Sequence, residues 1–294
     1  MLSVLLAIKI GIDPVIADVA GVEITWHGLF TALGVVAGVA VAAYLARRAG
    51  YPEDTVYNVA LSLVIGGIIG ARGLYVIENW SLFKDDLGEI FAINTGGISI
   101  YGALIGGTVG GWLYVFLRKV PNIPLGADIA AVGGIIGMAV GRIGDIINGE
   151  HFASDTDLPW GVVYTHRDSP SYIAFGPGGL PQHPAVAYEL IGDLVIFLLL
   201  LVVYARSQRA GITFFAWVFL YGLLRTLVSF LRLDDIVFVG LRTAQLIGIV
   251  AMVSGLAGIA YFLRTPPGEE RASRAERRRM MREEAPPAEE PTGT

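Results

Sequence analysis

The stretch "DIAAVGGIIGMAVGRIGDIINGEH", residues 128–151, decides how this chain folds. Its first 20 residues are mostly apolar or glycine, and about 20 such residues are what an α-helix needs to cross the hydrocarbon core of a bilayer. The far end of the stretch carries Arg142, Asp145, Asn148 and Glu150. A charged side chain inside a membrane costs roughly 2.5–3.5 kcal/mol, so each of these groups needs a partner, a water-filled cavity or a function.

The composition of the whole chain agrees with this interpretation. Of its 294 residues 54% are hydrophobic and only 16% are charged, with a mean hydropathy of +0.62, whereas soluble domains carry about 25% charged residues. Apolar stretches near the spanning length recur along the chain. We therefore predict an all-α integral membrane protein with about seven transmembrane helices, at 28–46, 56–77, 98–117, 128–147, 186–204, 212–231 and 243–263.

Basic residues follow alternate spans. Because positively charged loops stay in the cytoplasm, this pattern places the N-terminus outside and the C-terminus inside. The residues concerned are Arg47 and Arg48, Arg118 and Lys119, Arg206 and Arg209, and Arg264 with the arginines that follow it.

Three parts of the chain differ in composition. We expect residues 1–26 to form an N-terminal arm at the membrane interface, residues 27–264 to form the seven-span domain, and residues 265–294 to be a disordered cytoplasmic tail. Residues 149–185, between the fourth and fifth spans, are rich in aromatics, prolines and turn formers and predict an ordered external cap.

Small residues and cysteine give two further constraints. Glycines at four-residue spacing, as in "GGIIGARG" (66–73) and "YGALIGGTVGG" (101–111), predict close helix packing, which could also bound a lipid cavity. The chain has no cysteine, so any thiol chemistry must use a thiol of a partner.

The polar groups gather in the outer layer of the predicted spans. Arg142 and Asp145, three residues apart, share a helix face, as do Tyr221, Arg225, Ser229 and Arg232 in the sixth span. Two arginines in one cavity suit an anion, especially a phosphate. A structural ion pair between helices is the alternative for Arg142 and Asp145, and ordinary loop solvation is the expectation for Arg232.

The four histidines indicate less about function than the arginines do. His27, in "TWHGLF" (25–30), is either an acid–base group or an interfacial side chain. His151, His166 and His183 lack the spacing of metal ligands, so we expect neither a metal nor a cofactor.

Several motifs of the chain resemble those of a known family. "GRIGDIINGEHFA" (141–153) is similar to the signature of bacterial prolipoprotein diacylglyceryl transferases, Gly-Arg-x-Gly/Ala-Asn-Phe-x-Asn-x-Glu. Further landmarks in the family's order extend the resemblance over nearly the whole chain before the tail: "WHGL" (26–29), "GGISIYGALIGG" (96–107), "HPAVAYE" (183–189), "YGLLR" (221–225) and "LRTAQL" (241–246).

The resemblance implies an activity and its partners. Such enzymes transfer the diacylglyceryl group of phosphatidylglycerol to the lipobox cysteine thiol in the signal peptide of a preprolipoprotein, form a thioether and release glycerol 1-phosphate. It therefore implies a multi-pass protein of the bacterial inner membrane, surrounded by membrane lipids and without a nucleic-acid partner. One alternative is a transporter with an arginine-lined anion path, which the one-sided polar layer and the lack of related halves disfavour. Another is a phosphatidyltransferase that uses a metal-bound nucleotide, but the sequence shows no aspartate-rich Mg²⁺ motif.

Individual residues also carry over from the resemblance. It implies that Arg142 binds the phosphatidylglycerol headgroup and that Arg225, with Tyr221 as its partner, acts on the phosphate or the thiol, while Asn148, Glu150, Asp128 and Glu189 match further family positions. Our predicted site adds residues that depart from the family: Arg142, Asp145, Asn148 and Tyr101 bind phosphatidylglycerol, and Arg225, Tyr221, His27 and Glu150 are catalytic. Some positions depart from the family pattern: Asp145 replaces an asparagine, His27 a tyrosine, Ala153 a glycine and Ser229 a glutamate, and Tyr101 stands where some members have histidine. The thiol proton could go to His27, Glu150, Asp145 or water.

Overall fold

The computed structural model describes residues 7–19, 21–91, 96–177 and 179–264. The predicted tail, residues 265–294, and the first six residues of the predicted arm lie outside this part. Seven of the described helices are long and apolar enough to cross a membrane, which confirms the predicted class. They are α2 (Trp26–Ala49), α3 (Glu53–Glu78), α5 (Ile100–Leu117), α6 (Ile123–Asn148), α8 (Ala185–Arg206), α9 (Ile212–Ser229) and α10 (Thr243–Arg264).

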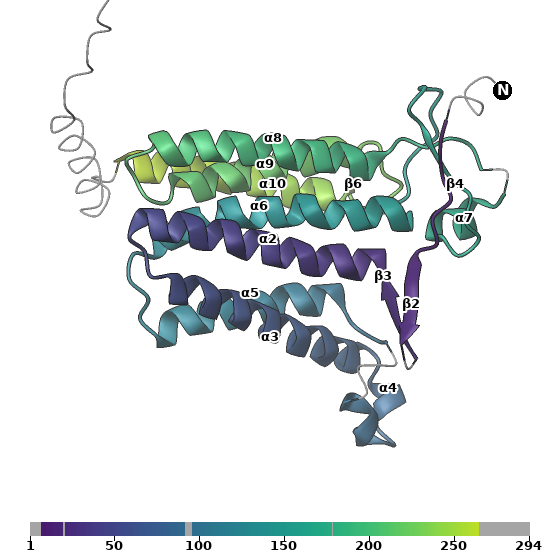
Figure 1. Ribbon diagram of the computed structural model, residues 1–294, viewed down its shortest axis with the longest axis horizontal. Coiled ribbons are helices and arrows are strands. Elements are labelled where there is room, and N and C mark those ends of the chain that lie inside the picture. The colour runs from purple at the N-terminus through teal and green to yellow at the C-terminus, as the bar shows by residue number, and fades with distance from the viewer. Residues whose placement is uncertain (1–6, 20, 92–95, 178, 265–294) are drawn as a thin grey trace, which may run out of the picture.

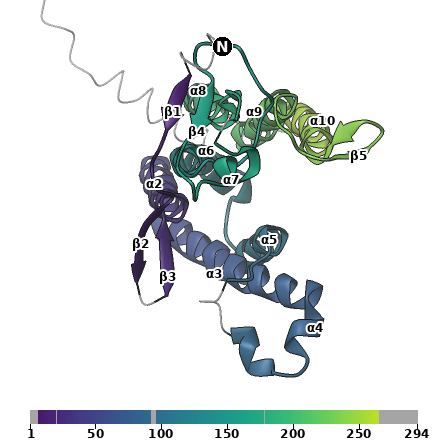
Figure 2. The same ribbon diagram turned by 90° about the vertical axis from the view of Figure 1, so that its right-hand side faces the viewer.

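The seven helices run side by side (Figure 1) and pack mainly in pairs. Helix α2 packs on α6, α3 on α5, and α9 on α10, while α8 contacts α6 and α9. The tightest apolar core lies around α6 and α8, where Leu125, Ile135 and Leu200 are fully buried. The α3–α5 pair stands apart from the rest and contacts it mainly through α2 (Figure 2).

Glycines bring the paired helices together. A Cβ added at Gly38 of α2 would lie 2.8 Å from the carbonyl oxygen of Gly133 in α6. One added at Gly222 of α9 would lie 2.8 Å from the carbonyl oxygen of Gly248 in α10. The glycines of α3 and α5 face each other in the same way, so the predicted packing role is confirmed.

Short elements gather at one end of the bundle (Figure 1). Strand β1 (Ile8–Ile10) pairs in parallel with β4 (Val162–Tyr164), so the N-terminal arm and the segment between α6 and α8 are joined, and β2 (Val15–Val19) pairs antiparallel with β3 (Val22–Thr25). The remaining short elements are α4 (Trp80–Phe83), the 3₁₀ helix η1 (Leu87–Phe91), α7 (Pro170–Phe175), and the hairpin β5 (Ile236–Phe238) and β6 (Leu241–Arg242). The arm thus contains strands as well as irregular chain.

Two local features fix the ends of α6 and α9. Helix α6 stops at Gly149, whose φ of 76° is left-handed, and a Cβ there would meet the ring of Tyr164 at 2.7 Å. At the opposite end of the bundle the buried carboxylate of Asp128 accepts hydrogen bonds from the N–H groups of Gly211 and Phe214, at 3.0 and 2.8 Å. Asp128 therefore caps the start of α9.

Candidate active site

A buried carboxylate, Glu189 near the start of α8, is the centre of the polar layer. Its side chain is 1% exposed and interacts with arginines from α6, from α9 and from the segment after α9. Arg142 Nη2 lies 3.0 Å from Glu189 Oε2, Arg225 Nη1 donates a hydrogen bond to Oε1, and Arg232 Nη1 lies 3.7 Å from Oε1. A single carboxylate thus gathers three cations in a low-dielectric region.

Asp145 is the second anchor of the cluster. Arg142 Nη1 donates to Asp145 Oδ2 at 2.9 Å, which confirms the pairing that their three-residue spacing predicts. The other oxygen, Oδ1, lies 2.6 Å from Nδ1 of His27 at the start of α2. Arg142 therefore links α6 to α8, and Asp145 links α6 to α2.

Asn148 and Glu150 continue the cluster toward the cap. Asn148 Nδ2 donates to Glu150 Oε1 at 3.0 Å, and Glu150 Oε2 lies 3.8 Å from His27 Nδ1. The carbonyl oxygen of Asn148 accepts a 2.9 Å hydrogen bond from the Ser169 hydroxyl of the cap. The cap therefore holds the end of α6 in place.

We expected Arg232 to be a solvated loop residue, and this prediction is wrong. Its side chain is only 8% exposed. Its guanidinium donates to both carboxylate oxygens of Asp234, at 2.9 and 3.1 Å. Burial acts to raise the pKa of Asp234, but the hydrogen bonds and charge of Arg232 outweigh it and hold that pKa below its usual range. The polar stripe of α9 was the sequence signal for this placement, since Arg232 extends it by one turn.

His151 also joins the cluster, although sequence reasoning gave it no role. Its Nδ1 lies 3.2 Å from Arg232 Nη2 and its Nε2 lies 3.8 Å from Asp145 Oδ2. Burial, and then the positive charge of Arg232, lower the pKa of His151. Because a guanidinium can only donate, Nδ1 is the acceptor and the imidazole is neutral. His151 has a φ of 67°, in the left-handed region.

The remaining predicted residues divide into two groups. Tyr221 of α9 lies close enough to Arg142 and Arg225 to interact with their charges. Tyr101 does not join the cluster, because it lies at the start of α5 in the helix pair that stands apart, and it is 64% exposed. The structure therefore does not bring Tyr101 to the other predicted lipid-binding residues.

Asp193, one helical turn beyond Glu189 in α8, is fully buried. Within the described part of the chain, neither of its carboxylate oxygens has a hydrogen-bond partner. Arg142 and Arg225 interact with the charge of Asp193, but their ion pairs are with Glu189. The two carboxylates of α8 therefore differ, because Glu189 contacts arginines directly and Asp193 has no hydrogen-bond partner among the described residues.

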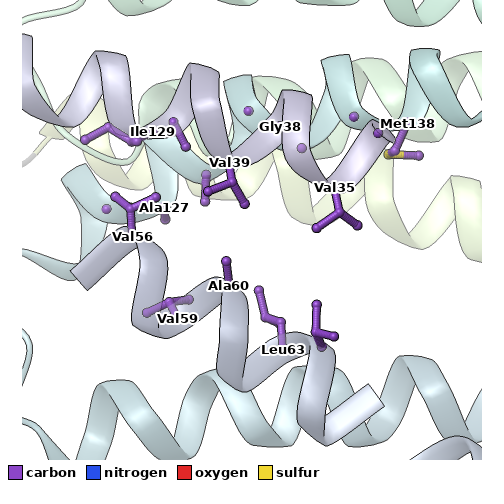
Figure 3. Close-up of a pocket in the computed structure, with 18 of the residues that line it drawn as sticks. Val35, Gly38, Val39, Val56, Val59, Ala60, Leu63, Ala127, Ile129 and Met138 are labelled. Atoms are coloured by element: carbon purple, nitrogen blue, oxygen red, sulfur yellow. The ribbon is translucent and has the colours of Figure 1, made fainter. Parts of the chain in front are cut away.

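An apolar groove of 640 Å³ leads away from the cluster. It runs between α2, α3 and α6, and Figure 3 shows Val35, Val59, Ala60 and Met138 among its lining residues. His27, Arg142 and Asp145 line it at one end, and Tyr51 and Val120 line it near the other ends of these helices. The groove therefore combines a long apolar surface with a charged end.

A second cavity, of 520 Å³, also borders the cluster. Strands β1 and β4 and the start of α8 line it, together with Glu150 and His151. Tyr164 in this wall donates to the carbonyl oxygen of Ile146 at 2.8 Å, and burial raises its pKa. Residues of the cluster thus line both the apolar groove and this second cavity, the chamber under the cap.

Two groups of described residues have donor atoms close enough to share a metal ion. One is His27, Asp145 and Glu150 in the cluster, and the other is Asp13 of the N-terminal arm with His166 and Asp168 of the cap. In the first group Asp145 is already hydrogen-bonded to both His27 and Arg142. That the protein needs no metal stays a prediction.

The fold and the site together define a polytopic membrane protein with an arginine-rich cluster at the end of an apolar groove. This architecture suits an amphipathic substrate that carries an anionic group.

Comparison with known proteins gives the family. Residues 14–261 match the family model described as prolipoprotein diacylglyceryl transferase. The chain is 36% identical to a phosphatidylglycerol–prolipoprotein diacylglyceryl transferase of Nostoc sp., over 84% of this chain and 88% of that protein. It is 32% identical to that of Clostridioides difficile, over 85% and 95%, and 36% identical to that of Geobacter sulfurreducens, over 76% and 84%.

The chain therefore belongs to the prolipoprotein diacylglyceryl transferase family. It is an enzyme, a membrane-bound transferase that acts in the first step of lipoprotein maturation. This membership sets aside the transporter and the metal-dependent phosphatidyltransferase as readings of the sequence.

Proposed function

We propose that the cluster transfers the diacylglyceryl group of phosphatidylglycerol to the lipobox cysteine thiol of a preprolipoprotein signal peptide. The observation that carries this proposal is the continuity of the apolar groove with the arginine cluster. Acyl chains would occupy the groove between α2 and α3, and the phosphate would lie at its charged end. A phospholipid with an anionic headgroup fits both parts at once.

The two central arginines have different roles in this proposal. Arg142 uses both terminal nitrogens on carboxylates, so it is held in one orientation. Arg225 donates through Nη1 to Glu189, and among the described residues its other nitrogens have no hydrogen-bond partner. Arg225 therefore offers free donors to the phosphate, while Arg142 supplies fixed positive charge and Tyr221 lies beside both.

The chemistry is a displacement at the glyceryl carbon. The thiol sulfur forms the new bond to that carbon, and the bond from the carbon to the phosphate oxygen breaks with its electron pair on oxygen. Glycerol 1-phosphate leaves with one more negative charge than the phosphate carried in the lipid. Arginines placed at that oxygen stabilise the developing charge before the reaction begins.

Other residues of the cluster would complete the site. Asp145 and Asn148 lie beside Arg142 and are suited to hold the headgroup, while His27 and Glu150 are candidates for taking the thiol proton. Tyr101 would contact membrane lipid at the exposed face of α5, away from the reacting groups.

One reconstitution tests the activity. Purified protein is mixed with phosphatidylglycerol vesicles and a lipobox peptide, and mass spectrometry detects the gain of one diacylglyceryl group. The same peptide with serine in place of cysteine should gain nothing. Absence of the adduct with the cysteine peptide would refute the proposal.

Substitution of the arginines tests their roles. Arg142→Lys and Arg225→Lys keep the charge but lose the planar fork, and each should lower the transfer rate about 100-fold. Arg206→Lys, at the exposed far end of α8, is the matched control and should leave the rate unchanged. Wild-type rates in both cluster variants would show that these arginines do not hold the phosphate.

The orientation in the membrane is part of the proposal. The basic ends of α2, α5, α8 and α10 would face the cytoplasm, and the cluster and cap would face outward from the inner membrane. Residues 1–26 would then lie at the outer interface as an arm on the domain 27–264, and residues 265–294 would be a cytoplasmic tail. Since the chain lacks cysteine, single variants report position: Lys84→Cys should react with an impermeant maleimide on intact spheroplasts, and Arg118→Cys should not. The reverse result would invert this topology.

A further inference from the structure

The hydrogen bond between His27 and Asp145 points to the group that removes the thiol proton. The two residues come from α2 and α6, 118 positions apart in the chain, and their side chains meet at 2.6 Å. Asp145 is 6% exposed, whereas the imidazole of His27 is 44% exposed and lines the apolar groove. A buried carboxylate therefore orients an imidazole that lines the groove proposed for the lipid.

The contact assigns the tautomer of His27. Both oxygens of Asp145 accept hydrogen bonds, one from Arg142 and one from His27 Nδ1. Nδ1 therefore carries a proton, and in the neutral imidazole this tautomer leaves Nε2 with a lone pair. Among the described residues Nε2 has no hydrogen-bond partner, so it is able to accept a proton from a substrate.

Asp145 and Glu150, the other candidates for the base, do not combine a free acceptor atom with a position in the groove. Asp145 has both oxygens engaged by protein donors. Glu150 accepts from Asn148 and lines the chamber under the cap, not the groove. The charged groups that face His27 are thus Asp145 and Glu150, which are negative, and Arg142, which is positive.

We propose that His27, oriented by Asp145, is the general base that converts the substrate thiol to a thiolate, a step that rests on the proposed function. The S–H proton passes to His27 Nε2 as the sulfur–carbon bond forms and the carbon–oxygen bond to phosphate breaks. The proton then leaves with glycerol 1-phosphate or to water. His27 is the catalytic residue of the pair and Asp145 is its positioning residue.

The test compares two nucleophiles. A selenocysteine lipobox peptide carries a selenol, which ionises more readily than a thiol and so needs no base. His27→Asn can still donate to Asp145 but cannot accept the proton. It should lower kcat about 100-fold with the cysteine peptide and less than tenfold with the selenocysteine peptide.

Three further variants separate a base from a structural residue. Arg142→Lys should lower kcat with both peptides alike, because the phosphate must leave in either case. His166→Asn, a matched change at the surface of the cap, should lower neither. Asp145→Asn, which keeps an acceptor but removes the charge, should follow His27→Asn with a smaller loss.

Each outcome decides the inference. An equal loss with both peptides in His27→Asn, or wild-type kcat with the cysteine peptide, would overturn the assignment of His27 while leaving the transferase activity in place. Failure of the wild-type protein to modify either peptide would instead overturn the proposed function.

Discussion

Glu189 shows how single residues organise this site. A carboxylate that is 1% exposed would be strongly unfavourable alone, and it is stable here because Arg142 and Arg225 contact it directly. The arginines in turn are held within reach of the groove. Removing Glu189 would leave buried cations without partners, so its role in positioning cannot be separated from its role in folding.

His151 makes the stability of the folded protein depend on pH. Its pKa is lowered by burial and by Arg232, so the folded protein binds fewer protons than the unfolded chain as pH falls below about 6.5. Stability is therefore lost as pH falls through that value. His151→Asn, which tolerates the left-handed φ of 67°, should make this loss smaller, because asparagine does not titrate.

The measurement is the thermal midpoint of the purified protein in detergent at pH 8, 7, 6 and 5. His166→Asn in the cap is the control and should keep the wild-type pH dependence. Identical pH slopes for wild type and His151→Asn would show that His151 does not lose its proton on folding.

At the scale of elements, glycines decide which helices pair. In α3 and α5 the glycines face one another so closely that their backbones touch, and the same arrangement joins α2 to α6 and α9 to α10. In a bilayer no hydrophobic effect drives helices together, so van der Waals contact between backbones becomes a main source of stability.

Gly70 and Gly73 of α3 make a matched pair for testing this. A Cβ at Gly70 would meet the Gly106 backbone of α5 at 2.7 Å and would overlap the carbonyl oxygen of Gly102, whereas a Cβ at Gly73 meets nothing within 4 Å. Gly70→Ala should therefore destabilise the protein by about 1–3 kcal/mol. Gly73→Ala should change stability by less than about 0.5 kcal/mol.

Unfolding in mixed micelles, followed by circular dichroism, measures both variants. Equal stability of the two would mean that α3 and α5 can move apart at no cost. Such a result would contradict a rigid α3–α5 pair.

Two compartments of the molecule, the groove and the chamber under the cap, border the same polar cluster. The groove between the α3–α5 pair and α2 is apolar, and the chamber under the cap is bounded by the N-terminal strand and the start of α8. The helix pair that stands apart in Figure 2 forms one wall of the groove. Both compartments therefore reach the same charged groups.

Filling the groove tests this arrangement. Ala60 lies on the groove side of α3 (Figure 3), and Ala60→Phe should raise the KM for phosphatidylglycerol about tenfold by occupying space for an acyl chain. Leu61→Phe, the neighbouring residue, is 56% exposed and does not line the groove, so its KM should stay at the wild-type value. Equal KM values for both variants in vesicle assays would place the lipid elsewhere.

Much of this architecture was predictable from the sequence. The spans are set by local composition, because a helix of about 20 apolar residues must cross the bilayer wherever it occurs. The predicted span 128–147 corresponds to α6, which covers Ile123–Asn148. The pairing of Arg142 with Asp145 was predictable for the same reason, since three residues along a helix define one face.

Contacts between distant segments were decided only by the tertiary structure. No local rule brings His27 to Asp145, buries Arg232, or directs Asp128 to cap α9, because each of these depends on how helices far apart in sequence cross. Likewise the exposure of Tyr101 follows from the α3–α5 pair standing apart, which depends on glycine contacts between helices. The sequence by itself determined the spans, the family and the polar layer, since these follow from short-range composition and motifs. The three-dimensional packing decided which of those polar groups meet.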